Sequence, residues 1–100
     1  MTKTARMKEI KEEIEWYRPK KTIANAMLKL GEMGFESSGH GCGFGGEDFS
    51  LTSKKYYVNF CDTGKKVIVS ITNNDDDMDS VYDGTVQGAL KFLTNLKKKS

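Results

Sequence analysis

The sequence predicts an α+β domain with two N-terminal helices, a three-stranded antiparallel β-meander and a C-terminal helix packed on one sheet face. Three observations predict it: apolar residues recur at helical spacing before residue 34, they alternate with polar residues over 47–72, and helical spacing returns after residue 80. The chain has 100 residues, of which 37% are hydrophobic and 30% charged, as is typical of a globular protein. We therefore expect a single domain over 1–100.

The first two elements are predicted helices over 4–17 and 20–33. Apolar residues three and four positions apart define their buried faces: Met7, Ile10, Ile14 and Tyr17 in the first, and Ile23, Met27, Leu30 and Met33 in the second. Pro19 separates the two patterns, and Gly34 suits the C-terminal cap of the second. A helical pair therefore opens the domain.

The segment 47–72 is predicted to form the meander. Its alternating apolar residues are Phe49, Leu51, Tyr56, Val58, Phe60, Val67, Val69 and Ile71. Turns of even length keep all of these on one face, and they pair Leu51 with Tyr56 and Phe60 with Val67. The sequence thus predicts one apolar face for the helices and one open face.

Residues 39–46 contain five of the ten glycines, the only histidine and one of the two cysteines. The glycine spacing formally satisfies GxGxxG, but a helix precedes it and a strand follows, which is the reverse of a dinucleotide-binding unit. We therefore expect no nucleotide here. The segment is predicted to be a Gly-rich connector that carries His40, Cys42 and Phe44 on a loop.

The two cysteines permit three interpretations. Reduced thiols are the simplest, because two cysteines in 100 residues do not make a disulfide scaffold. A Cys42–Cys61 disulfide is an alternative under oxidising conditions. A metal- or thiol-dependent protein is a more distant one, since His40 with both cysteines falls one ligand short of a closed tetrahedral site and no orienting group for a nucleophile is visible. No cofactor is therefore predicted.

The last element is a predicted helix over 80–96. Ser80 is the expected N-cap, and Asp83 stands three residues later as its capping partner. The buried stripe comprises Tyr82, Val86, Ala89, Leu90, Leu93 and Leu96. This helix is expected to cover the apolar sheet face.

An acidic stretch leads into this helix, formed by Asp75, Asp76, Asp77, Asp79 and Asp83. Its alternation resembles a calcium loop, but Ser80 and Val86 replace the glycine and glutamate that an EF-hand requires. Some of the acids suit the N-terminal end of a helix dipole. Five of them also suggest a surface that meets a basic partner or keeps polyanions away.

The order helix, three strands and helix, from about Thr22 to Leu96, resembles the topology of the double-stranded RNA-binding domain. The resemblance implies a lysine cluster at the start of the final helix, where that family grips phosphates. This chain instead has aspartates over 75–79. Because aspartates repel phosphate, the resemblance extends to topology only.

These observations favour a non-enzymatic protein-binding regulator or inhibitor with an acidic surface, such as a small phage or mobile-element protein that blocks a host defence or nucleic-acid-binding protein. The candidate protein-binding residues are Asp75, Asp76, Asp77, Asp79, Asp83, His40, Cys42, Phe44, Tyr57, Asn59 and Ile68. The net charge of +2 is too small to indicate nucleic acid by itself.

Nucleic-acid binding is the alternative function. It would use Lys20, Lys21, Lys54, Lys55, Lys65 and Lys66, with Tyr57 as a stacking group. The chain has neither 18 consecutive apolar residues nor an apolar N-terminal run. A cytoplasmic location without membrane contact is therefore the expectation.

Overall fold

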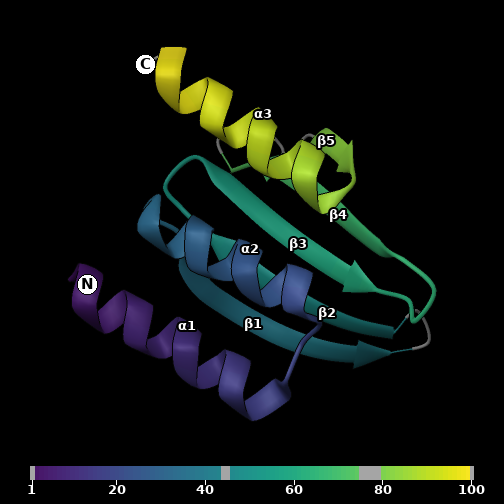
Figure 1. Cartoon of the computed structure of the whole chain (residues 1–100). Coiled ribbons are helices and arrows are strands. Elements are labelled where there is room, and N and C mark those ends of the chain that lie inside the picture. Colours follow the sequence, from purple (N-terminus) through teal and green to yellow (C-terminus); the bar gives the residue numbers. More distant parts are fainter. Residues whose placement is uncertain (1, 44–45, 75–79, 100) are drawn as a thin grey trace.

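The computed structural model describes residues 2–43, 46–74 and 80–99, which form three helices and five strands (Figure 1). In chain order the elements are α1 (Lys3–Tyr17), α2 (Lys21–Glu32), β1 (Glu36–Gly43), β2 (Gly46–Thr52), β3 (Tyr56–Asp62), β4 (Val67–Asn73), β5 (Ser80–Gly84) and α3 (Val86–Lys99). The α+β class and the two N-terminal helices agree with the prediction. All three helices lie on the same face of the sheet (Figure 1).

The prediction of a three-stranded sheet is wrong. The described strands form one antiparallel sheet in the order β1-β2-β3-β4-β5, so the predicted meander is its centre and one further strand lies at each edge. Each strand pairs with its neighbour in the sequence. The helix–three-strand–helix topology that resembled the RNA-binding domain is therefore not the topology of this protein.

The first edge strand, β1, replaces most of the predicted Gly-rich connector. It pairs with β2 from Glu36 opposite Thr52 to Gly43 opposite Gly46, with an irregularity at Ser38. The segment lacks the apolar alternation that identifies a half-buried strand, yet backbone hydrogen bonds to β2 need no such side chains. The connector prediction is therefore wrong for the part of 39–46 that the structure describes.

The other edge strand, β5, replaces the predicted start of the last helix. Ser80 Oγ does donate a hydrogen bond to Asp83 Oδ2 over 3.2 Å, but both residues are in β5. Thr85 is the residue that caps α3, because its Oγ1 accepts a hydrogen bond of 3.1 Å from the backbone N–H of Gly88. The helix begins six residues later than the sequence predicted, at Val86.

The pairing of the central strands is shifted by two residues from the prediction. Leu51 pairs with Val58, and Phe60 pairs with Val69. Each turn lies one residue later than expected. In the first turn Ser53 N–H donates to the carbonyl of Tyr56, and in the second Thr63 N–H donates to the carbonyl of Lys66. A shift of two keeps every side chain on its predicted face, so the predicted apolar face is confirmed although the partners differ.

The core lies between this face and the helices. It comprises Ile10, Ile23, Ala26, Met27, Leu30, Phe35, Phe49, Leu51, Val58, Phe60, Val69, Ile71, Ala89 and Leu93. Helix α1 contributes only Ile10 to the set of buried residues. It approaches α2 closely at Gly31, where a Cβ atom would lie 2.6 Å from Cδ1 of Ile10 and 2.7 Å from Sδ of Met7.

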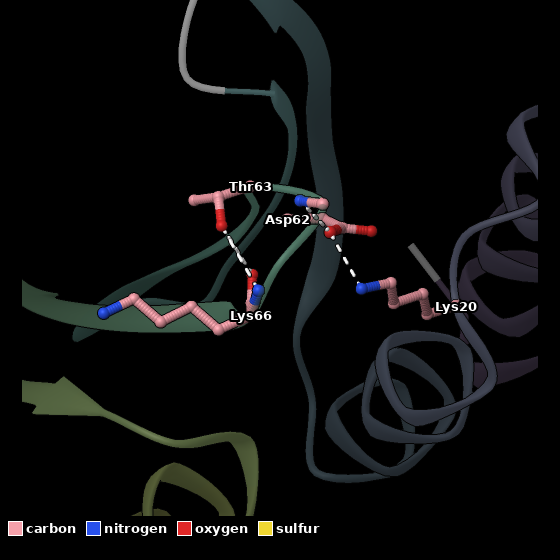
Figure 2. A network of polar contacts seen from close by, with 5 residues as sticks. Lys20, Asp62, Thr63 and Lys66 are labelled. Atoms are coloured by element: carbon pink, nitrogen blue, oxygen red, sulfur yellow. Dashed lines mark hydrogen bonds and ion pairs between the residues drawn. The ribbon is translucent and has the colours of Figure 1, made fainter.

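A polar network joins the start of α2 to the β3–β4 turn (Figure 2). Lys20 Nζ lies 3.2 Å from Asp62 Oδ1, which also accepts a hydrogen bond of 2.9 Å from Gly64 N–H. Thr63 and Lys66 close the turn through a mutual pair of hydrogen bonds. The Gly64 N–H lowers the pKa of Asp62, partial burial opposes this, and Lys20 lowers the pKa further. Asp62 therefore stays ionised and keeps the turn in place.

Candidate functional site

The imidazole of His40 lies between two aromatic rings on the helix-covered face. The Tyr17 ring stacks on it with a centroid distance of 3.7 Å and an interplanar angle of 15°, and the Phe49 ring lies 4.8 Å away. The Nε2–H of His40 donates to Glu47 Oε2 over 3.2 Å. The side chain of His40 is only 12% exposed. Sequence reasoning placed His40 on a loop, whereas β1 holds it in a fixed orientation under the end of α1.

Glu13 ties α1 to β1 at the same place. Its Oε2 accepts a hydrogen bond from the Ser37 hydroxyl. Its Oε1 is shielded from solvent and has no hydrogen-bond partner among the residues that the structure describes. Burial raises the pKa of Glu13, the nearby His40 opposes this, and Glu9 adds to the increase. The surroundings of Glu13 therefore favour its protonated, uncharged form over the carboxylate.

These residues border an open groove between α1 and β1, which we call the α1–β1 groove. It is lined by Glu9, Glu12, Glu13, Trp16, Tyr17, Gly39 and His40. Trp16 is 80% exposed, which is the largest value among the exposed large hydrophobic residues. Glu9, Glu12 and Trp16 follow one another at helical spacings, so one side of α1 combines carboxylates with an uncovered aromatic ring.

The charge around Trp16 is predominantly negative. On its other side, Trp16 borders a second hollow together with Glu12, Glu15 and Arg18. No salt bridge within the described ranges engages Glu9 or Glu12. The carboxylates are therefore available to a ligand that approaches the indole.

A test of the Glu13 environment is the substitution Glu13→Gln. The raised pKa means that folded protein binds a proton at Glu13 more readily than unfolded protein does. The stabilising contribution of protonation is therefore complete below the ordinary pKa of glutamate and is lost as the pH rises through the raised value. Glu13→Gln should increase the free energy of unfolding at pH 7 by less than about 1 kcal/mol, because water screens this partly exposed group.

Urea unfolding of wild type and Glu13→Gln, measured from pH 4 to pH 7, checks this prediction. The advantage of the variant should grow as the pH rises, while the amide oxygen still accepts from Ser37. Glu15→Gln is the control, since Glu15 is an exposed carboxylate of the same helix. A difference between wild type and Glu13→Gln that stays constant over the whole pH range would contradict the assignment.

The second group of predicted residues lies on the opposite face of the sheet, which no described helix covers. There the hydroxyl of Tyr57 donates to Ser50 Oγ over 2.7 Å, and Ser50 in turn donates to Asn59 Oδ1 over 3.0 Å. Ile68 lies on the same face in β4, opposite Cys61. The structure therefore brings Tyr57, Asn59 and Ile68 onto one surface, where Ser50 links the polar side chains of Tyr57 and Asn59.

Cys61 and His40 are not brought together. Cys61 pairs with Asp48 on the uncovered face, whereas His40 lies on the covered one. Burial raises the pKa of Cys61, and so do a hydrogen bond to Asp48 and the charges of Asp48 and Asp62. The thiol is therefore protonated at neutral pH and a weak nucleophile. Among the described residues, no three His, Cys, Asp or Glu side chains are grouped so that they could hold a metal ion.

The disulfide alternative also conflicts with the strand order. Cys42 is in β1 and Cys61 is in β3, so β2 lies between their backbones. Two strand spacings amount to about 9.5 Å, which exceeds the limit of about 7 Å between the Cα atoms of a disulfide. Bridging these cysteines would require the backbone to move.

The predicted acidic surface is described only at its end. Asp83 is exposed in β5 and pairs with Ser70 of β4. The other acidic candidates and one aromatic candidate lie outside the described residues: Asp75, Asp76, Asp77, Asp79 and Phe44. The structure therefore gives no geometry for most of that surface.

The lysines of the nucleic-acid alternative are dispersed. Lys54 and Lys55 are in the β2–β3 turn, whereas Lys65 and Lys66 are in the β3–β4 turn at the other end of β3. Lys20 is engaged by Asp62. These side chains do not form one basic patch.

Sequence reasoning did not identify Trp16. The apolar stripe that predicts the first helix does not contain this tryptophan. The position of the residue could have revealed it. The only tryptophan of the chain lies among glutamates on the charged side of the predicted helix, where it cannot serve to pack the core.

The fold and this site define a small α+β domain with a helix-covered antiparallel sheet and an acidic, aromatic groove at one edge. No protein-family model, curated protein or solved structure matches the chain. In the parts of the chain that the structure describes, no helix combines the length and the apolar character needed to cross a membrane.

Proposed function

We propose that this protein is a non-enzymatic protein-binding module, a regulator or inhibitor, and that it contacts its partner through the α1–β1 groove. The exposure of Trp16 is the observation on which the proposal rests: this residue is 80% exposed, whereas the other exposed large hydrophobic residues, Tyr17 and Val81, are 39% and 38% exposed. Burying such a surface against a partner is strongly favourable, and tryptophan is enriched among the residues that dominate interface energies.

One wall of the groove is held by contacts within the protein. Tyr17 is stacked on His40, and His40 is held by Glu47, so these side chains have little rotational freedom left to lose. A preformed surface loses less entropy on binding than a mobile one. The groove therefore suits a partner better than the uncovered sheet face, where Tyr57, Ser50 and Asn59 already bond to one another.

Partner capture tests the proposal. Wild-type protein and the variant Trp16→Ala are immobilised and exposed to lysate of the cells in which the protein acts, with and without nuclease treatment. We expect wild type to retain a protein that Trp16→Ala binds about 30-fold more weakly or not at all, because truncating such an anchor costs about 2 kcal/mol. Circular dichroism and thermal unfolding should be unchanged, since the indole is exposed.

Val81→Ala is the matched control, because Val81 is an exposed apolar residue (38%) of β5, at the other edge of the sheet. It should retain the partner as wild type does. Equal retention by Trp16→Ala would exclude the groove as the contact surface. Recovery that disappears with nuclease would favour the nucleic-acid alternative instead.

A further inference from the structure

We propose that the α1–β1 groove binds an arginine side chain from a basic segment of the protein partner, with the guanidinium stacked on Trp16 and paired with Glu9 and Glu12. The inference rests on the function proposed above and specifies the chemistry of its partner. The charge of the groove, its exposed aromatic ring and the charge of the whole chain support this assignment.

The first step is charge complementarity. The groove lining contains Glu9, Glu12 and Glu13 and no lysine or arginine. No ion pair among the described residues neutralises Glu9 or Glu12. A cation placed among these carboxylates would relieve their mutual repulsion, which contributes through Glu9 to the raised pKa of Glu13.

The second step is the choice of cation. An exposed indole attracts a cation to its ring face, and a planar guanidinium can stack there while its N–H groups donate to carboxylates. A lysine ammonium is a compact and strongly hydrated charge that makes neither the stacked nor the bidentate contact. The combination of Trp16 with Glu12, one helical turn before it, therefore favours arginine.

The third step is that binding of a basic peptide cannot come from a general negative charge of this protein. The chain as a whole has a net charge of +2, so its overall field repels a basic peptide. Binding of such a peptide would therefore report on a local site. Arg18, which lies on the other side of Trp16 in the second hollow, opposes the ligand there and makes the α1–β1 side the favoured one.

The experiment uses fluorescence anisotropy of a labelled peptide of alternating glycine and arginine residues. Its control is the same peptide with citrulline, which has the shape of arginine without its charge. We expect saturable binding of the arginine peptide and affinity about tenfold or more lower for the citrulline peptide. The double variant Glu9→Gln/Glu12→Gln and the variant Trp16→Ala should each weaken binding about tenfold or more, and added salt should weaken it as well.

Glu32→Gln is the matched control variant, because it removes an exposed carboxylate of α2 outside the groove. It should bind the arginine peptide as wild type does. Equal affinity for both peptides, or a double variant that binds normally, would overturn the inference. If a protein partner is captured through Trp16 while the peptides show no arginine preference, the proposed function stands and this inference fails; capture that does not depend on Trp16 removes the proposed function itself.

Discussion

The variant Phe49→Ala is expected to lower the free energy of unfolding by about 3–5 kcal/mol, the range for removing a buried aromatic ring. The Phe49 side chain is completely buried in β2, opposite Phe60 of β3 and His40 of β1. Its removal would leave a cavity between the sheet and the helices. It would also remove the ring that packs against His40, so the stacking of Tyr17 on His40 should loosen.

Urea unfolding followed by far-UV circular dichroism measures this loss. Phe49→Leu is the matched control, since it keeps much of the apolar volume and should cost roughly 1–2 kcal/mol. If Phe49→Ala lost less than about 1 kcal/mol, the ring could not be at the centre of the core as described.

The second large effect is expected at the start of β2. Gly46 has φ of +115°, a backbone conformation that side chains disfavour, and a Cβ atom there would overlap the carbonyl oxygen of Asp62. The obstacle is backbone, so it cannot rotate away. We expect Gly46→Ala to lower the free energy of unfolding by about 3–4 kcal/mol, from backbone strain and steric overlap together.

Gly64→Ala separates the two causes. Gly64 also has a positive φ, +87°, but a Cβ atom there would meet nothing within 4 Å. Its substitution should therefore cost only the conformational strain, about 1–2 kcal/mol. Equal losses at both glycines, measured by the same urea unfolding, would mean that β2 does not approach the β3–β4 turn as closely as the structure has it.

The sequence predicts the elements whose own side chains specify them. The helices over 4–17 and 20–33 and the buried face of the central strands follow from apolar periodicity. The two edge strands do not, because Glu36–Gly43 has almost no apolar side chains and Ser80–Gly84 contains a local pair, Ser80 with Asp83, that also suits a helix start. The pairing partner decides the structure of both segments.

The strand register and the α1–β1 groove show two further features that cannot be predicted from the sequence. A two-residue shift leaves every apolar residue on the same face, so periodicity cannot detect it; hydrogen bonds within the turns at Ser53 and Thr63 decide the pairing. Trp16 and His40 both line the α1–β1 groove although they are far apart in the sequence, and no local pattern predicts that they share one groove. Only the missed strand β1 brings them together.

The strand order has a consequence for how the chain folds. Because every strand pairs with the next one along the chain, the sheet can grow hairpin by hairpin, and each step closes only a short loop. Chains rich in such local pairings reach the native state faster than chains whose strands must find distant partners. Helix α1 and strand β1 are separated in the sequence by the whole of α2, so their contact closes a longer loop than a hairpin does. We therefore expect the groove to assemble after the central hairpins have formed.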